Sequence, residues 1–226
     1  MNESYWLIVL MVVAYFIGSV PFGLVVGFAK GVDIRQQGSR NIGASNAGRV
    51  LGHKKFFFLV FCLDLLKSML PMLVASMIAA RVAPEARSSW LYLLWIGVGL
   101  MAMVGHVFPI YLKFKGGKGV ATGAGILLGL YPYFTFAGLL AIATFVVIVT
   151  LTRYISVASI IASFSFLLYY VLIGANQGWD VFGAQWPLFV VGLMLSTLIL
   201  WRHRENLRRL RAGTENKIRG RNSGPA

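Results

Sequence analysis

Long uncharged apolar stretches constrain this chain of 226 residues more than any other feature of its sequence. No charged residue occurs between Ser4 and Ala29, or over the 34 residues from Gly119 to Thr152. A helix that crosses the hydrocarbon core of a bilayer needs about 20 mostly apolar residues. Charged residues make up only 12% of the chain, well below the quarter or so that is typical of soluble domains. The sequence therefore predicts an all-α, polytopic membrane protein.

Interruptions in the apolar sequence divide it into seven predicted transmembrane helices. These are 4–29, 56–80, 90–112, two short helices within 119–152, then 154–173 and 186–201. The pair within 119–152 is predicted because Tyr131-Pro132-Tyr133 places a helix-breaking proline between two aromatic residues of the type that lies at membrane interfaces. The alternative is six spans, with 119–152 as one long tilted helix.

The net charge of +14 would suggest nucleic acid in a soluble protein, but here the charge follows the predicted topology. With seven spans, 18 of the 21 Lys and Arg residues fall on one side, in loops 30–55 and 113–118, at Arg153 and in the tail 202–226. Cytoplasmic loops carry the excess of basic residues, so the N-terminus is predicted outside and the C-terminus in the cytoplasm. No nucleic acid partner is needed to explain the charge. Residues 1–217 are expected to form one domain, and 218–226 a basic, disordered tail.

A first motif, Gly38–Arg49, concentrates glycine, serine, asparagine and arginine in the first basic loop. Glycine permits backbone angles at which successive N–H groups converge on an anion. Arginine adds a bidentate fork for phosphate. The motif is interpreted as a phosphate site, and the alternative is a flexible loop close to anionic lipid.

A second motif, Lys115–Thr122, reads Lys-Gly-Gly-Lys-Gly-Val-Ala-Thr directly before a predicted helix. Backbone N–H groups and the helix dipole make such a helix start a favourable place for phosphate. The motif differs from a P-loop, in which the lysine is followed by Ser or Thr, because Gly119 follows Lys118.

A third motif, His203–Glu215, begins the basic tail. His203, Asn206 and Arg209 are spaced by three residues and share one face of a predicted helix. The alternative is a basic helix that lies on anionic lipid next to the membrane.

Two charged residues, Asp64 and Lys67, lie one turn apart inside a predicted span. Charges in lipid are costly, so both are expected to face the protein interior, to neutralise each other and to support the site. His106 is expected to be a buried core histidine. No Gly-x-Ser-x-Gly elbow and no His/acid pattern with zinc spacing occurs, so neither a serine hydrolase nor a metal or other cofactor is predicted.

The three motifs together resemble the PlsY family of integral-membrane, acyl-phosphate-dependent glycerol-3-phosphate acyltransferases. The first family pattern matches Gly38, Ser39, Asn41, Gly43, Ala44, Ser45, Asn46 and Arg49. The second matches Gly105–Pro109 and Lys115–Thr122, and the third matches His203, Asn206, Arg209, Leu210, Gly213 and Glu215. The likeness also includes Ser19–Gly23, Asp64 and Lys67. It extends over the predicted spans to about Lys217.

This resemblance implies transfer of a fatty acyl group from acyl phosphate to the sn-1 hydroxyl of glycerol 3-phosphate, in the bacterial inner membrane with the active site facing the cytoplasm. The implied catalytic residues are Ser39, Arg49, Lys118, His203 and Asn206. The implied substrate-binding residues are Gly38, Asn41, Gly43, Asn46, Gly116, Gly117, Gly119, Thr122 and Arg209. Asp64, Lys67, His106 and Glu215 are expected to support the site. The expected partners are the two substrates, the bilayer and, as a candidate, the soluble enzyme that makes acyl phosphate.

Two other classes of function remain open on the sequence. A transporter for an organic phosphate could use the same basic residues, although its site would be expected at the bilayer midplane between inverted repeats. A non-catalytic protein whose tail binds anionic lipid would leave both glycine-rich motifs unexplained.

Overall fold

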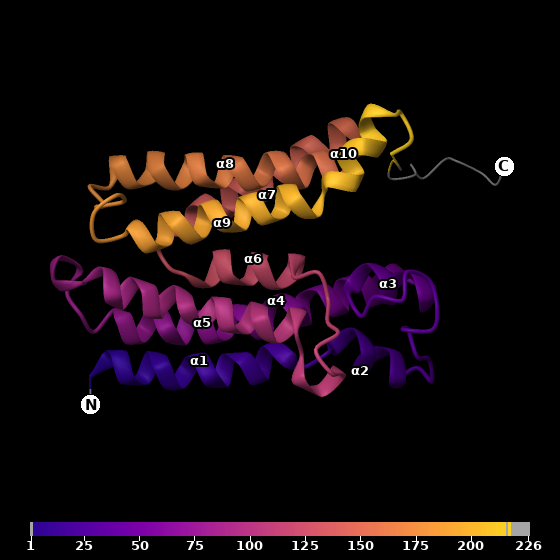
Figure 1. Ribbon diagram of the computed structural model, residues 1–226, viewed down its shortest axis with the longest axis horizontal. Coiled ribbons are helices and arrows are strands. Elements are labelled where there is room, and N and C mark those ends of the chain that lie inside the picture. Colours follow the sequence, from indigo (N-terminus) through magenta and orange to yellow (C-terminus); the bar gives the residue numbers. More distant parts are fainter. Residues whose placement is uncertain (1, 216, 218–226) are drawn as a thin grey trace. The chain divides into compact units, whose positions relative to one another are not determined.

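The computed structural model describes residues 2–215 and 217, and all regular secondary structure in them is helical (Figure 1). This confirms the all-α prediction. The α-helices are α1 (Glu3–Ser19), α2 (Phe22–Phe28), α3 (Ala44–Val50), α4 (Lys54–Ala79), α5 (Ser89–Val107), α6 (Val120–Gly129), α7 (Thr135–Thr152), α8 (Ile155–Asn176), α9 (Trp186–Arg202) and α10 (Arg204–Arg211). Two 3-10 turns are η1 (Pro84–Ala86) and η2 (Ile110–Leu112). The predicted tail, 218–226, lies outside the described residues.

The chain divides into two compact units, Met1–Thr135 and Phe136–Ala226. Among the described residues, five helical segments are long and apolar enough to cross a membrane: Glu3–Phe28, Lys54–Ala79, Ser89–Leu112, Thr135–Thr152 and Ile155–Asn176. The pair Trp186–Trp201 and Arg204–Arg211, bent by 48°, would make a sixth. The ten residues of α6 rise about 15 Å, half of the hydrocarbon core. Seven spans therefore remain a prediction.

The predicted interruption at Tyr131-Pro132-Tyr133 is confirmed, because α6 ends at Gly129 and α7 begins at Thr135. A single long helix over 119–152 is wrong.

The span predicted over 4–29 corresponds to the apolar segment Glu3–Phe28, but the chain leaves the helix inside it, between α1 and α2. Pro21 has no N–H to donate, and its ring disfavours helical geometry at the preceding residue. Val20 accordingly has an extended backbone, with φ −63° and ψ 118°. Its carbonyl oxygen accepts from Phe22 N at 3.1 Å and from Lys67 Nζ at 2.8 Å, so the interruption is stabilised by a side chain of α4.

Helix α4 is the centre of the first unit and contacts α1, α2, α3, α5 and α6. Gly125 and Gly129, four residues apart, lie where α6 meets α4. A Cβ at Gly125 would overlap the Leu65 carbonyl, and one at Gly129 would press on Met72. Small residues at these positions let the two backbones approach closely, as in other membrane helix pairs.

In the second unit, hydroxyl groups join α8 to its neighbours. Thr144 of α7 and Tyr169 of α8 are hydrogen-bonded at 2.9 Å, and Ser196 Oγ of α9 donates to the Ser163 carbonyl of α8 at 2.8 Å. Hydrogen bonds between helices are favourable in an apolar setting, where water does not compete.

Candidate functional site

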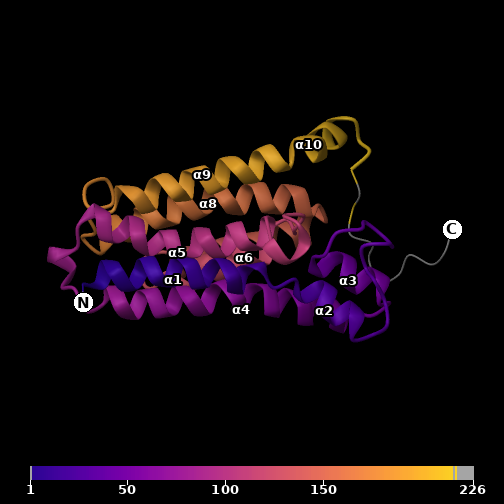
Figure 2. The ribbon, with the colours of Figure 1, turned by 60° about the horizontal axis from the view of Figure 1, so that its bottom comes forward.

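The first and second motifs lie at the same end of the first unit (Figures 1 and 2). The first motif includes α3 and precedes α4, and the second connects η2 to α6. Leu112 of η2 packs against the buried cluster under the first motif, which consists of Leu24, Ile34, Ala44, Ala47 and Val60. The two glycine-rich motifs therefore share one apolar base. The third motif belongs to the second unit.

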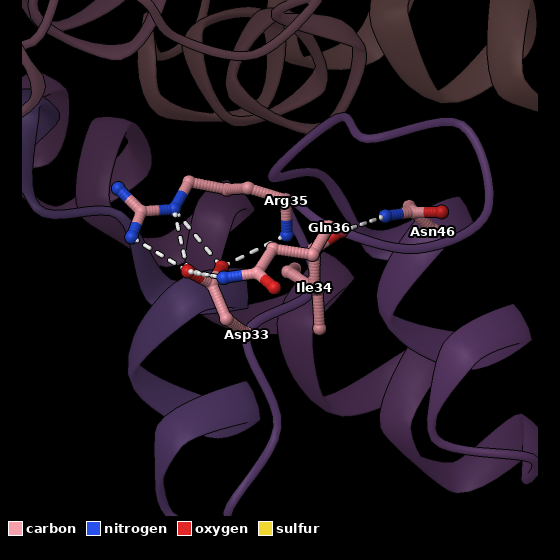
Figure 3. Close-up of polar contacts among 5 residues, drawn as sticks. All are labelled: Asp33, Ile34, Arg35, Gln36 and Asn46. Carbon is pink, nitrogen blue, oxygen red and sulfur yellow. Dashed lines mark hydrogen bonds and ion pairs between the residues drawn. The ribbon is translucent and has the colours of Figure 1, made fainter.

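In the first motif, Asn46 holds the preceding loop in place (Figure 3). Its Oδ1 accepts from Ser39 N at 2.8 Å, and its Nδ2 donates to the carbonyls of Ile34 at 2.8 Å and Gln37 at 3.3 Å. Asn46 is 1% exposed. Asn46 was expected to bind substrate. In the structure it lies under the loop, and its amide forms hydrogen bonds with backbone groups there.

A second side chain that shapes this loop is Asp33, which lies before the first motif and was not predicted to belong to the site (Figure 3). Its carboxylate accepts from Arg35 N at 3.0 Å, Arg35 Nε at 2.9 Å and Arg35 Nη2 at 2.7 Å. The guanidinium hydrogen bond, with further help from the Arg35 backbone, lowers the pKa of Asp33 from 3.8 to about 2. Arg35 is therefore engaged within its own loop.

Other polar residues of the first motif reach the surface. Ser39 and Arg49 are exposed, with Arg49 in the last turn of α3. Asn41 Oδ1 accepts from Gly43 N at 2.9 Å, just before α3 begins. Gly38 has φ +60°, and a Cβ there would overlap Asn46 Oδ1, so only glycine fits this turn without strain. The loop presents the Ser39 hydroxyl before α3, and the last turn of α3 presents the Arg49 guanidinium.

The second motif is fixed to the end of α5 by two backbone hydrogen bonds. Gly116 N donates to the Val107 carbonyl at 3.1 Å, and Gly117 N donates to the His106 carbonyl at 3.0 Å. Gly117 also lies against the imidazole of His106, where a Cβ would overlap Nε2. Contact with a ring from the neighbouring helix thus requires glycine at this position.

Helix α6 begins directly after this loop, with Gly119 as its N-cap at φ +78°. Gly119 provides no side-chain cap for the first N–H groups of α6. Lys118, exposed, immediately precedes the helix. A helix start with uncapped N–H groups and an adjacent lysine can hold a phosphate. Thr122, expected to bind substrate, is 0% exposed, and its carbonyl accepts from Ser68 Oγ of α4 at 2.8 Å, so it lies within the α4–α6 contact.

Below the second motif lie the buried residues Asp64, Lys67 and His106. Lys67 Nζ is 2.8 Å from Asp64 Oδ1, and His106 Nδ1 is 3.8 Å from the same oxygen. All three are at most 5% exposed. The expected mutual neutralisation of Asp64 and Lys67 and the expected burial of His106 are confirmed. Since Lys67 also donates to Val20 and His106 accepts from Gly117, these residues connect the α1–α2 interruption to the second motif.

In the third motif, His203 makes a contact that determines its tautomer. His203 Nδ1 lies 2.8 Å from the Ile199 carbonyl oxygen. A carbonyl only accepts, so Nδ1 carries the proton and, in the neutral ring, Nε2 has the basic lone pair.

Glu215 forms hydrogen bonds with the remaining polar residues of this motif. Its Oε1 accepts from Asn206 Nδ2 at 2.8 Å and Ser156 Oγ at 2.9 Å, and its Oε2 accepts from Arg209 Nε at 2.8 Å. Desolvation would raise the pKa of Glu215, but these hydrogen bonds outweigh it and lower the pKa below its usual value. The supporting role of Glu215 stays a prediction. Ser156 was not anticipated, because it is 59 residues away in the sequence.

Within residues 2–215 and 217, no group of three or more His, Cys, Asp or Glu residues could hold a metal ion. The polar groups that reach the surface in the three motifs are mainly donors of hydrogen bonds and positive charge, which suits anionic ligands.

Comparison with known proteins identifies relatives over nearly the whole chain. A family model described as glycerol-3-phosphate acyltransferase matches residues 8–213. A glycerol-3-phosphate acyltransferase of Anaeromyxobacter sp. (strain K) is 42% identical over 211 residues, covering 92% of this chain and 96% of the relative. Another, of Geobacter sulfurreducens, is 41% identical over 213 residues, covering 94% of this chain and 97% of the relative.

Two solved structures are similar in fold. The crystal structure of PlsY (YgiH), an integral membrane glycerol 3-phosphate acyltransferase, in its glycerol 3-phosphate form has a TM-score of 0.73 and 35% identity, covering 94% of this chain and 96% of that one. Its lysophosphatidic acid form has a TM-score of 0.73 and 34% identity, covering 94% and 95%.

Proposed function

The chain belongs to the glycerol-3-phosphate acyltransferase family, and we propose that it uses an acyl phosphate as donor and acylates the sn-1 hydroxyl of glycerol 3-phosphate. The products are lysophosphatidate and inorganic phosphate. Family membership supports the acyltransferase activity, since relatives at about 40% identity and both similar structures are named glycerol-3-phosphate acyltransferases. The donor and the position of acylation are the proposal.

The observation that carries the proposal is the pair of exposed, donor-rich motifs at one end of the first unit. Two phosphate-bearing substrates need two such sites. An acyl phosphate is already an activated mixed anhydride, so the enzyme needs no covalent intermediate. Orientation and electrostatic stabilisation can then supply most of the reduction in the barrier.

In this proposal, Lys118 and the N–H groups at the start of α6 hold the phosphate of glycerol 3-phosphate, and Gly116, Gly117 and Gly119 give the loop the conformation that presents them. Ser39, Asn41 and Arg49 hold the acyl phosphate and stabilise the charge of the departing phosphate. Gly38, Gly43 and Asn46 keep the backbone of the first motif in the conformation that presents these groups.

The reaction itself is a direct displacement at the acyl carbon. The sn-1 hydroxyl oxygen bonds to the carbonyl carbon, the bond from that carbon to the phosphate oxygen breaks, and phosphate leaves with the electron pair. The hydroxyl proton goes either to His203 Nε2, whose lone pair the Ile199 contact leaves available, or to a phosphate oxygen of a substrate. Asn206, oriented by Glu215, would align the hydroxyl.

The protein is an integral membrane protein with several apolar helices, like the structures it resembles. The proposed topology has seven spans in the bacterial inner membrane, with the N-terminus outside and the C-terminus and active site on the cytoplasmic side. A cytoplasmic site is accessible to soluble glycerol 3-phosphate and to a soluble enzyme that delivers acyl phosphate.

The test is an assay of the purified protein in detergent with palmitoyl phosphate and labelled glycerol 3-phosphate. Lysophosphatidate acylated at sn-1 and one equivalent of phosphate are expected. Palmitoyl-CoA in place of palmitoyl phosphate is expected to give no product. Product only with the thioester would contradict the proposed donor, and no product with any donor is the result expected of a transporter or a lipid-binding scaffold.

His203 separates the two routes for the proton. A general base contributes about 10²–10⁴-fold to the rate. If His203 is the base, His203→Ala should lower kcat within that range in the same assay. Activity within about tenfold of wild type would assign the proton to a substrate phosphate instead.

A further inference from the structure

After α10 the chain turns back along the helix, in a segment, Gly213–Glu215, that we call the return segment. Gly213 has φ +70°, the left-handed conformation that ends many helices. Thr214 N donates to the Arg209 carbonyl at 2.8 Å, which fixes the direction of the turn. Glu215 is thereby brought level with Asn206 and Arg209, the two side chains that it binds.

Ser156, in the first turn of α8, binds the same carboxylate from another helix. It is 3% exposed, and its Oγ donates to Glu215 Oε1 at 2.9 Å, the oxygen that also accepts from Asn206 Nδ2. The start of α8 also favours a carboxylate through the helix dipole. A second contact joins the same regions, because Lys217 Nζ lies 5.4 Å from the ring centre of Tyr154, directly before α8.

We infer that Ser156 is a positioning residue for the third motif: by holding Glu215, it fixes the side chains of Asn206 and Arg209. Without Ser156, the hydrogen bonds of Glu215 all come from α10, which the return segment follows directly, so nothing in this group ties the motif to α8. The kinetic part of this inference rests on the proposed function, whereas the structural part does not.

Hydrogen exchange tests the structural part without turnover. The amide of Thr214 should exchange at least about fivefold faster in Ser156→Ala than in wild type, because local opening of the return segment becomes easier. Ser156→Thr keeps the hydroxyl and should restore protection. Ser163→Ala is the matched control, since its Oγ donates only to Ile160 of the same helix, at 2.8 Å, and its loss should leave Thr214 unchanged.

Steady-state kinetics test the consequence for the reaction. Small misplacement of an orienting group can cost about 10- to 100-fold in rate, so Ser156→Ala should lower kcat by about tenfold or more. The KM for palmitoyl phosphate should change by less than about twofold, since that substrate is assigned to the first motif and Ser156 binds Glu215 of the third. Ser156→Thr should recover most of kcat, and Ser163→Ala should behave as wild type.

A double-mutant cycle identifies the route of the effect. In a Glu215→Ala background, Ser156→Ala should have no further effect on kcat or on exchange at Thr214, because residues that act through one another are not additive. An undiminished effect in that background, or a Ser156→Ala protein indistinguishable from Ser163→Ala, would overturn the inference. If the wild-type protein transfers no acyl group, the proposed function fails, and the exchange measurements still decide whether Ser156 orders the motif.

Discussion

The fold requires glycine at position 117, because this residue lies directly against the imidazole of His106. A Cβ at this position would overlap His106 Nε2, and the ring cannot easily move because it is 5% exposed between α4, α5 and the loop. A methyl group must therefore displace the loop. The backbone N–H groups that follow Gly117 would then lose their alignment with the start of α6.

Gly117→Ala is expected to raise the apparent KM for glycerol 3-phosphate by at least about tenfold, because the phosphate cradle is displaced, while the KM for palmitoyl phosphate changes little. Gly123→Ala is the control, since a Cβ there would make only an ordinary contact, 3.4 Å from Met103 Cε. An unchanged KM for glycerol 3-phosphate in Gly117→Ala would remove the second motif from that substrate.

Asp33 and Arg35 give a prediction at the same scale that depends on pH. The folded-state pKa of Asp33 is about 2, below its ordinary value of 3.8. The stabilisation from this carboxylate is therefore fully present above pH 3.8 and is lost as the pH falls through about 2. Arg35→Gln removes the main cause and should return the pKa toward 3.8, as measured by carbon-detected NMR of the labelled carboxyl. A carboxyl that still titrates near 2 in Arg35→Gln would assign the shift to the remaining hydrogen bonds, from the backbone at position 35 and from Gln36.

Among the elements, the interrupted helix of α1 and α2 depends on α4. The peptide group at Pro21 cannot continue the hydrogen-bond ladder, and unsatisfied backbone groups are costly at membrane depth. Lys67 donates to the freed Val20 carbonyl and is itself neutralised by Asp64. The buried Asp64–Lys67 ion pair therefore also stabilises the backbone at the interruption between α1 and α2.

Lys67→Met should destabilise the protein by about 3–5 kcal/mol, because it leaves Asp64 buried without a partner. Unfolding in detergent measures this. Asp64→Asn combined with Lys67→Met should recover much of the loss, since no unpaired charge remains. Lys55→Met is the control, on the exposed first turn of the same helix, and should change stability by less than about 0.5 kcal/mol. Equal stability of Lys67→Met and wild type would mean that Asp64 is not ionised.

For the whole molecule, the proposed orientation makes a direct prediction. Cys62 is the single cysteine, so Cys62→Ser provides a background without thiols. New cysteines at Asn2 and Ala83 should react with a membrane-impermeant maleimide in right-side-out vesicles, whereas one at Ala212 should react only after permeabilisation. Labelling of Ala212 and Asn2 from the same side would indicate an even number of spans, and the reverse pattern would invert the topology.

The fold was predictable where a residue's own chemistry decides its place. The interruption at Pro132 was predicted because aromatic residues flank a proline in a stretch too long for one span. The interruption at Pro21 was missed because the surrounding uncharged stretch has the length of a single helix. Burial of Asp64 and Lys67 was predicted because two charges one turn apart inside a span have few other solutions.

The sequence predicted which motifs form the site, but not which of their polar side chains are exposed and which are buried. Asn46 belongs to the first motif by sequence, yet its amide is used by the carbonyls of Ile34 and Gln37. Thr122 belongs to the second motif, yet it is enclosed between α4 and α6. Nothing in the local sequence distinguishes these residues from Ser39 or Lys118, which are exposed.

The sequence by itself determined the helical membrane class, the interruption at Pro132 and the location of the donor-rich motifs. These features follow from hydropathy and charge, which are properties of each residue in its immediate neighbourhood. Only the tertiary structure decided which polar side chains face outward and which hold the backbone, as Asn46, Lys67 and Glu215 do. The reason is physical. A hydrogen bond between Ser156 and Glu215 joins residues 59 apart, and their encounter depends on how the helices pack rather than on either residue's own sequence context.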